Sequence, residues 1–278
     1  MSRIEHIRRD LEDYRAAQFI TGALQDISAL RMQATRKQFE KNIEFYQDIQ
    51  QLYRIVKAYA VQTAPKEKSS KRRRQYLYVA VTSNKHFYGT QNRDIILSLM
   101  ERLPDPHGKD CLIVGEAGWQ YIKDTEHKDR CKRIVFTDDM PTSEESEALM
   151  QRLIGYERVF VLYPKFINPF RQDVAMVDIT ETPDPATPKE MSVDYIFEPE
   201  IPTLLAFFET QVRNMLFERV MLESDLARSA ARLMKMRNAQ ERARELASEH
   251  QTHLRKEVGS LADMQLLETF AGYTQWKK

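Results

Sequence analysis

The chain has 278 residues, of which 42% are hydrophobic and 30% are charged, enough apolar side chains for a buried core and much helical surface in water. A formal net charge of +1 excludes a strong overall field that would attract nucleic acid or a membrane surface. No apolar run reaches the roughly 18 residues that a membrane span needs, and the first residues lack the apolar core of a signal peptide. We therefore expect a soluble cytoplasmic protein, or one held at a membrane only through partners.

The first 64 residues contain no proline and are predicted to form one long helix. Apolar side chains recur there at steps of three and four, at Ile4, Ile7, Leu11, Tyr14, Ala17, Ile20, Leu24, Ile27 and Leu30. The steps do not keep a strict heptad, which favours an irregular antiparallel pair of helices over a uniform zipper. Gly22 is the weak point of this helix, and costs about 1 kcal/mol relative to Ala unless a neighbour packs closely against it.

Residues 65–75 separate this helix from the middle of the chain. Six cations lie between Lys66 and Arg74. The pattern favours a solvated basic linker over a polyanion-binding or localisation patch.

In residues 76–201 the spacing of apolar residues becomes that of an α/β domain. Five β-rich runs are expected to form strands, at 76–82, 111–115, 133–137, 158–164 and 172–180. Helices are predicted between them, including one over 94–103 and one that opens on a capping box from Thr142 to Glu145 and runs through Leu153. Strands alternating with short helices predict a Rossmann-like domain with a mostly parallel, five-stranded sheet.

Residues 202–278 are predicted to form a second long helix, because strong helix formers dominate and no proline follows Thr203. We expect the two terminal helices to pair as a long antiparallel coiled coil. Four methionines of this segment suit either a buried core or an adaptable contact surface: Met215, Met221, Met234 and Met236.

No group of residues forms a recognisable catalytic, cofactor or metal site. The GEAG sequence at Gly115–Gly118 follows a strand but lacks the spacing of a phosphate loop, so Gly115 is interpreted as a strand-end turn. His250 and His253 lack a third metal ligand. Cys111 and Cys131 are expected to be free thiols in a reducing compartment rather than a structural disulfide. The loop carboxylates are explained by favourable helix dipoles: Asp124, Asp138, Asp139, Glu144 and Glu145.

Three stretches of the chain resemble the gamma subunit, or central rotor stalk, of F-type ATP synthases. The first is Ile20, Thr21, Gly22, Ala23 and Leu24 followed by Arg31, which is similar to the family's I-T-x-A-M signature and its following lysine. The second is the stretch 82–92, where Ser83, Gly89 and Asn92 match the S-D-x-G-L-C-G-x-F-N motif. The third runs from Phe197-Glu198-Pro199 to Arg232, Met234 and Met236.

The departures from the family pattern indicate a divergent or alternative member. Ala227-Arg228 stands where the family has Ser-Glu. Near the C-terminus Val258-Gly259 replaces an Arg-Gln pair.

The resemblance implies a non-catalytic subunit that couples rotation to conformational change in a catalytic ring. It implies as partners the catalytic alpha/beta-type subunits, an epsilon-type subunit and a membrane c-type ring, with no cofactor and no nucleic acid. It places the protein peripherally on the cytoplasmic face of a bacterial inner membrane, and it suggests that Arg228 and Arg232 contact carboxylates of the ring.

Two other classes of function stay open at this point. A helical scaffold or adaptor with an α/β head would share the same layout. An enzyme with its site in the head is less well supported, because the sequence offers no nucleophile, metal set or phosphate loop.

Overall fold

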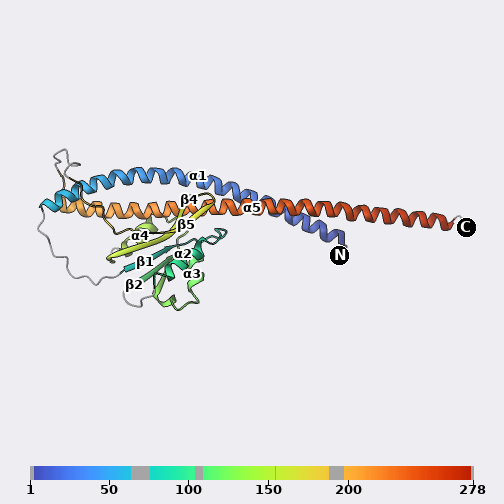
Figure 1. Ribbon diagram of the computed structural model, residues 1–278, viewed down its shortest axis with the longest axis horizontal. Helices are drawn as coiled ribbons and strands as arrows, with labels where there is room; N and C mark the ends of the chain where they lie inside the picture. Colours follow the sequence, from blue (N-terminus) through green and yellow to red (C-terminus); the bar gives the residue numbers. More distant parts are fainter. Residues whose placement is uncertain (1–2, 64–75, 104–108, 154, 188–196, 277–278) are drawn as a thin grey trace. The chain divides into compact units, whose positions relative to one another are not determined.

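The computed structural model describes residues 3–63, 76–103, 109–153, 155–187 and 197–276, and the predicted basic linker lies outside them. Two long helices, α1 (Arg3–Thr63) and α5 (Ile201–Trp276), flank an α/β domain in the sequence (Figure 1). Both predicted terminal helices are thus confirmed. Pro202 falls in the first turn of α5, where its missing N–H would have no intrahelical partner in any case.

The chain divides by its contacts into two compact units. One unit contains residues 1–28 and 233–278, and the other contains residues 29–232. We call the first the helical unit and the second the head unit. The division crosses both long helices.

In the helical unit the two helices run antiparallel. The Arg3 guanidinium lies 3.1 Å from the Glu257 carboxylate, and Arg15 Nη2 donates to Gln251 Oε1 at 2.7 Å. The residue numbers of the contacts increase along α1 and decrease along α5, which confirms the predicted antiparallel arrangement. The seam is narrow and includes small side chains, with Ile7, Leu11, Met236, Ala243 and Ala247 buried.

Gly22 has a close neighbour on the opposing helix segment, the condition under which a glycine is useful at this position. A Cβ added there would lie 2.6 Å from Gln240 Nε2 on the opposing segment. The glycine therefore lets a long polar side chain lie directly against the backbone of α1.

The head unit contains the predicted five-stranded sheet, in the order β3-β2-β1-β4-β5. The strands are β1 (Tyr76–Val81), β2 (Lys109–Val114), β3 (Cys131–Ile134), β4 (Arg158–Asn168) and β5 (Arg171–Asp178). All pairs are parallel except β4 with β5. The mostly parallel sheet is confirmed.

All five strands differ from their predicted bounds by at least one residue, and β3 and β4 differ most, for reasons of pairing. β4 continues past Pro164 to Asn168, because β1 pairs with β4 only as far as Leu162 and β5 pairs with the rest. Pro164 therefore lies where one side of the strand needs no N–H donor. β3 begins at Cys131 and ends at Ile134, and residues 135–137 leave the sheet to enter the loop described below.

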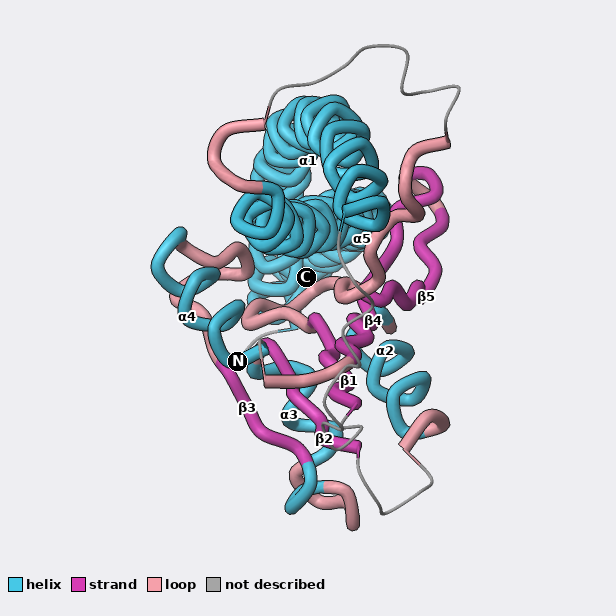
Figure 2. The backbone as a smooth tube through the Cα atoms, turned by 90° about the vertical axis from the view of Figure 1, so that its left-hand side faces the viewer, coloured by secondary structure: helices cyan, strands magenta, loops and turns pink. Residues whose placement is uncertain are grey.

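Helices cover both faces of the sheet, so that the head unit has three layers (Figure 2). On one face lie α4 (Ser143–Leu153) and the head-unit parts of α1 and α5, which contribute Leu149, Tyr53 and Phe217 to a shared core. On the other lie α2 (Gln91–Met100) and α3 (Glu116–Ile122). A short 3₁₀ turn, η1 (Lys128–Arg130), leads into β3.

The predicted capping box at the start of α4 is confirmed. The Glu145 N–H donates to Thr142 Oγ1 at 3.2 Å, and the Thr142 N–H donates to Glu145 Oε2 at 2.9 Å. This reciprocal pair satisfies two N–H groups that the helix start would otherwise leave unpaired.

Candidate functional site: a polar joint in the head unit

Two loops at the carboxyl edge of the sheet form the base of the site. One follows β1 and runs from Thr82 to Thr90, and the other follows β3 and includes Phe136 to Asp139. Asn84 ties them together, because its Nδ2 donates to Phe136 O at 2.8 Å and to Asp138 O at 3.2 Å. Its Oδ1 accepts the N–H of Glu116 at 3.1 Å.

Gly115 is required beside these loops, as its interpretation as a strand-end turn suggested. Its φ is 101°, in the region that favours glycine. A Cβ there would lie 2.7 Å from Thr82 O. The backbone after β2 can therefore approach the backbone after β1.

Asp139 is the buried acceptor at the centre of the site. Its side chain accepts the N–H of Asn84 at 2.6 Å and the hydroxyl of Tyr88 at 2.5 Å. Burial acts to raise the pKa of Asp139, but the charge of Arg228 and the bonds from Tyr88 and the backbone outweigh it and hold the pKa below its usual value. Asp139 is therefore ionised although it is only 3% exposed.

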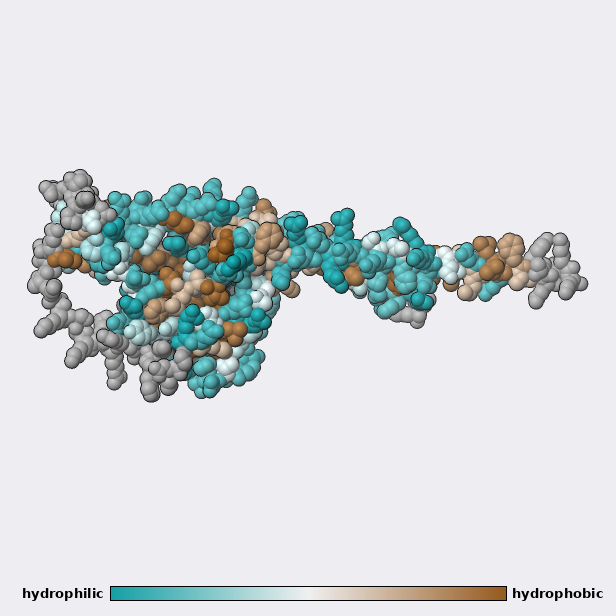
Figure 3. Space-filling model, viewed as in Figure 1, coloured by the Kyte–Doolittle hydropathy of each residue, from teal (hydrophilic) through white to brown (hydrophobic). Residues whose placement is uncertain are grey.

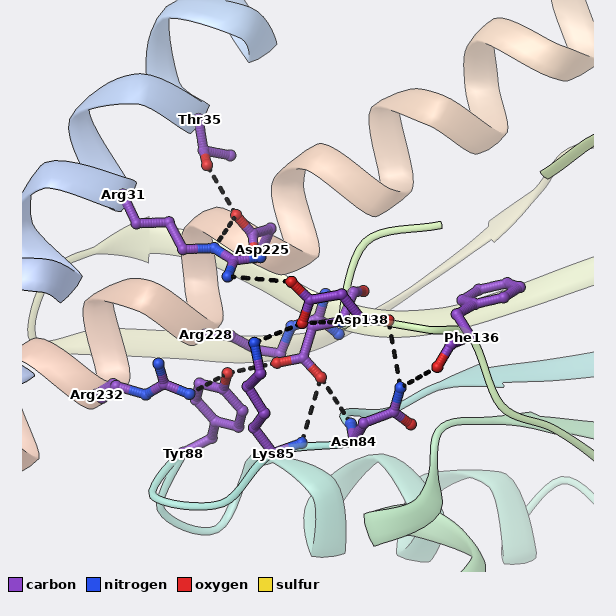
Figure 4. Close-up of polar contacts among 11 residues, drawn as sticks. Arg31, Thr35, Asn84, Lys85, Tyr88, Phe136, Asp138, Asp225, Arg228 and Arg232 are labelled. Atoms are coloured by element: carbon purple, nitrogen blue, oxygen red, sulfur yellow. Dashed lines mark hydrogen bonds and ion pairs between the residues drawn. The ribbon is translucent and has the colours of Figure 1, made fainter. Parts of the chain in front are cut away.

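α5 contributes two arginines to this centre (Figure 4). Arg228 is 1% exposed, and its guanidinium donates to Thr82 O at 3.2 Å and to Asp139 O at 3.0 Å. One turn further on, Arg232 lies over the ring of Tyr88, with its Cζ 4.6 Å from the centroid, and also donates to the Tyr88 hydroxyl. The arginines thus bind α5 to both loops.

α1 joins the same site through Asp225 of α5. Arg31 makes a two-point contact, from Nη2 to Asp225 Oδ1 at 2.8 Å and from Nε to Oδ2 at 3.1 Å. The Thr35 hydroxyl donates to Asp225 Oδ2 at 2.7 Å. Two-point arginine–carboxylate contacts are among the strongest charged hydrogen bonds. They fix the relative register of α1 and α5 within the head unit.

Asp138 links α1 to the loops. It lies 3.8 Å from Arg31 Nη1 and 2.5 Å from Lys85 Nζ. Burial acts to raise the pKa of Asp138, yet the bonds from Lys85 and from the Asp139 N–H, with the charges of Lys85 and Arg31, lower it overall.

We call these residues the polar joint, since they connect both long helices to the sheet: Arg31, Thr35, Asn84, Lys85, Tyr88, Asp138, Asp139, Asp225, Arg228 and Arg232. Four cations face three carboxylates within it. Arg31 and Lys85 form ion pairs with Asp138 or Asp225, and Arg228 and Arg232 donate to backbone carbonyls and to the Tyr88 hydroxyl. The arrangement therefore fits a structural connection rather than a reacting centre.

A second buried polar contact lies on the same helix. The Tyr163 hydroxyl of β4 donates to Glu223 Oε2 at 3.0 Å. Burial raises the pKa of both Glu223 and Tyr163. This contact adds another directional bond between α5 and the sheet.

Three loop positions that match the family motif in residues 82–92 shape the loop beneath the joint: Ser83, Gly89 and Asn92. Ser83 is fully buried, and its hydroxyl accepts from Asn92 Nδ2 at 2.8 Å while Asn92 Oδ1 accepts the Ser83 N–H at 3.2 Å. Gly89 has a φ of 66°. These three residues shape the loop that presents Lys85 and Tyr88.

The matching positions on the long helices fall into different environments. Arg31 and Arg232 are partly buried within the joint, and Arg228 is buried there. A ring contact through Arg228 would require these bonds to open, and the contacts predicted for the two α5 arginines stay predictions. The remaining positions lie in the helical unit, where Met236 is buried, Thr21, Leu24 and Met234 are partly buried, and Ile20 and Ala23 are exposed.

Sequence reasoning missed the central partners of the joint. Asp138 and Asp139 were explained by helix dipoles, whereas the structure pairs them with Lys85, Arg31 and Arg228. The available signal was their position directly after a parallel strand, at the same sheet edge as Tyr88. Asp225 carried no signal, because its partner lies 194 residues away in the sequence.

The described residues contain no cluster of three or more His, Cys, Asp or Glu side chains arranged to hold a metal ion. Among the helices of the described part, none is both long and apolar enough to cross a membrane.

Comparison with known proteins places the chain in a family. The family model described as "ATP synthase" matches residues 3–272. The chain is similar to the ATP synthase gamma chain of Psychrobacter sp. (strain PRwf-1), with 22% identity over 270 residues that cover 90% of this chain and 91% of the relative. It is 20% identical to the ATP synthase gamma chain of Polynucleobacter asymbioticus, over 98% of this chain and 99% of that one.

Solved structures share the fold. A chain of the Euglena gracilis mitochondrial ATP synthase, from a structure described as OSCP/F1/c-ring in rotational state 3, matches with a TM-score of 0.66 and 15% identity, over 98% of this chain and 93% of that chain. A chain of the Tetrahymena thermophila central stalk and c-ring matches with a TM-score of 0.59 and 21% identity, over 79% of this chain and 99% of that one.

The fold defined by two long terminal helices and a mostly parallel α/β sheet is thus that of ATP synthase stalk chains. The family match covers nearly the whole chain, so this protein belongs to the ATP synthase family as a distant gamma subunit of the central stalk. In that family it is a non-catalytic subunit.

Proposed function

We propose that this gamma subunit transmits torque through the polar joint, so that the head-unit parts of α1 and α5 turn together with the sheet. The supporting observation is that the buried Arg228 of α5 donates to both loops, while Arg31 of α1 binds the buried Asp225 of α5 and lies 3.8 Å from Asp138. Rotation at the head would then reach the catalytic subunits through α1 and α5.

The energetics of the joint favour such a rigid connection. Turning or sliding α5 against the sheet would separate Arg228 from Thr82 and Asp139 and leave a buried charge without partners. Breaking a buried charged pair costs on the order of 3–5 kcal/mol. A purely apolar interface would tolerate small shifts at lower cost, because dispersion contacts are not directional.

The helical unit offers the surface that we assign to the catalytic ring. Phe19, Ile20 and Ile27 of α1 are more than half exposed, and Leu267 and Phe270 of α5 are also exposed. Figure 3 shows apolar side chains gathered toward the C-terminal end of α5. A stalk biases the catalytic subunits only if it contacts their conformations unequally, and exposed apolar side chains provide such contacts without fixed hydrogen bonds. We retain the partly buried Arg232 as a proposed ring contact.

One solved relative comes from an assembly described as OSCP/F1/c-ring, and another comes from one described as central stalk and c-ring. For this chain we propose catalytic alpha/beta-type subunits around the helices, with an epsilon-type subunit and a membrane c-type ring at the head. The coupled ion would be H⁺ or Na⁺, and the complex would lie at the cytoplasmic face of a bacterial inner membrane. We also propose four segments for this role: 1–64, 65–75, 76–201 and 202–278.

Reconstitution tests the proposal. The chain is co-expressed with the catalytic and membrane subunits of its own genome, and ATP hydrolysis and ATP-driven ion transport are measured in vesicles. We expect the chain to co-purify with an active ring. Asp225→Asn should lower the number of ions moved per ATP, whereas Arg36→Met, at an exposed arginine of α1 paired with Glu40, should not. A chain that remains outside the ring, or equal coupling in both variants, would contradict the proposal.

A further inference from the structure

Two cysteines of the head unit lie opposite each other on neighbouring parallel strands. Cys111 of β2 and Cys131, the first residue of β3, are register partners. Side chains at paired positions of parallel strands point to the same face of the sheet. Both cysteines belong to the same buried cluster, with 1% and 6% of their surfaces exposed, and both thiols are free.

The two thiols have different acidities because one donates to the other. The hydrogen bond from Cys111 lowers the pKa of Cys131 more than burial raises it, and the charge of Arg130 lowers it further. The same bond, with burial, raises the pKa of Cys111. Cys131 therefore has the more nucleophilic sulfur, since the thiolate is the reactive form, and Cys111 retains its proton.

The backbone geometry suits a bond between the two sulfurs. Adjacent strands lie about 4.7–4.9 Å apart, within the roughly 4.4–6.8 Å that a disulfide accepts between Cα atoms. In the described sheet β3 has only four residues and pairs only with β2. Such a short edge strand has few ladder hydrogen bonds to resist a local shift that brings the Cβ atoms together.

We propose that Cys111 and Cys131 are a peroxide-sensitive dithiol that closes to a reversible disulfide between β2 and β3. The sulfur of Cys131 attacks one oxygen of hydrogen peroxide, the O–O bond breaks, and the departing hydroxide takes up a proton to leave as water. The sulfur of Cys111 then attacks the resulting sulfenic acid, the S–S bond forms, and a second water leaves with the proton of Cys111. Two thiols and one peroxide thus give one disulfide and two waters.

The burial of the pair favours a small oxidant. A hollow of about 360 Å³ is lined in part by Cys111, Arg130 and Lys132, and Cys131 is not among its lining residues. Hydrogen peroxide needs little room to approach thiols that are 1% and 6% exposed, whereas oxidised glutathione is bulky. We therefore assign the site to peroxide.

The bond would secure the edge of the sheet that ends in the polar joint. β3 begins at Cys131, and the chain continues from its other end to Asp138 and Asp139. A link at the start of β3 should slow the exchange of its amide hydrogens. This effect does not depend on the proposed torque transmission.

The test uses the purified full-length chain and hydrogen peroxide as the probe. We expect the folded chain to lose two thiols without forming dimers, and a linked peptide containing both cysteines to appear two hydrogens lighter than the separate peptides. Dithiothreitol should restore both thiols. Methionine oxidation adds oxygen and does not consume thiols, so thiol titration separates the two reactions.

Single variants assign the roles of the two sulfurs. Cys131→Ser should slow the loss of the remaining thiol by at least about tenfold, because the thiolate is the reactive form. Cys111→Ser should give a sulfenic acid at Cys131 that the diketone dimedone traps. Alanine variants replace the serine variants if those do not fold, and the wild-type result needs neither.

Three outcomes would overturn the proposal. The first is that both thiols survive a peroxide dose that oxidises free cysteine. The second is that disulfides form only between chains. The third is that oxidation is no faster in the folded chain than in urea, where the register of β2 and β3 is lost.

Discussion

Two stretches of α5 differ sharply in what surrounds them. Residues 220–231 are all buried and include Glu223, Asp225 and Arg228, each bonded to another element of the head unit. Residues 258–272 are all exposed, although several of them are apolar, such as Leu267 and Phe270. One helix therefore contains a buried segment whose polar side chains bond to other elements of the head unit, and a segment whose apolar side chains are exposed to solvent.

Removal of the buried arginine should have the largest effect on the chain itself. Arg228→Met leaves the carbonyls of Thr82 and Asp139 without their donor and removes the cation that faces the Asp139 carboxylate. We expect the free energy of unfolding to fall by about 3–5 kcal/mol, as measured by urea denaturation followed by circular dichroism. Arg36→Met is the matched control and should change it by less than about 0.5 kcal/mol. Similar losses in the two variants would disprove the central place of Arg228.

Disruption of the contact between α1 and α5 should come next. Asp225→Asn keeps the size of the side chain but removes the charge that Arg31 and Thr35 bind. We predict a loss of about 2–3 kcal/mol, since hydrogen bonds to charged groups each contribute about 1.5–3 kcal/mol. A double-mutant cycle with Arg31→Met should show a coupling energy of about 1–2 kcal/mol. A coupling energy near zero would mean that the contact between Arg31 and Asp225 contributes nothing to the free energy of unfolding.

The lowered pKa of Asp139 predicts a pH dependence of stability. A carboxylate whose pKa is lower in the folded state contributes its full stabilisation above the unfolded pKa of about 3.9 and loses it as the pH falls through the folded value. The difference in urea midpoint between the wild type and Asp139→Asn should therefore be largest near pH 6 and shrink below about pH 4. A difference that stays constant from pH 6 to pH 2.5 would rule out this origin.

Gly22 allows a smaller effect to be measured in the helical unit. Gly22→Ala gains about 1 kcal/mol of helix propensity, but it forces Gln240 to move. We expect net stabilisation of less than about 1 kcal/mol. Gly259→Ala, where no atom lies within 4 Å of the new Cβ, isolates the propensity contribution. The stabilisation by Gly259→Ala minus that by Gly22→Ala gives the cost of moving Gln240, and a value of zero or below would show that the close contact is unimportant.

The exposed segment of α5 should give the smallest effect on stability. Leu267→Ser with Phe270→Ser removes apolar surface that is already in water, so the free energy of unfolding should change by less than about 0.5 kcal/mol. In the reconstituted complex the same variant should bind the catalytic subunits more weakly, as measured by co-purification. An unchanged affinity would contradict the surface that we assign to the ring.

Much of the fold could be predicted from local patterns. The proline-free stretches predicted α1 and α5, the alternation of strands and helices predicted a mostly parallel sheet, and Thr142 with Glu145 predicted the start of α4. Such features depend on neighbours a few residues apart. The ends of β3 and β4 were less predictable, because they depend on which strand lies alongside.

The site was predicted only in part. The motif positions Arg31, Ser83 and Arg232 do lie in or directly beneath the polar joint. Asp225, Asp139 and Tyr88 were not assigned a role in it, because nothing close to each of them in sequence identifies its partner.

The sequence by itself determined that two long helices enclose an α/β domain, because helix propensity and apolar periodicity act over a few turns. Only the tertiary structure decided which charges meet, as with Arg31 and Asp225, or Arg228 and Thr82, which lie 146 residues apart. A charged side chain is stable in water until folding removes that water. Its partner is then fixed by the packing of whole elements, which no local pattern specifies.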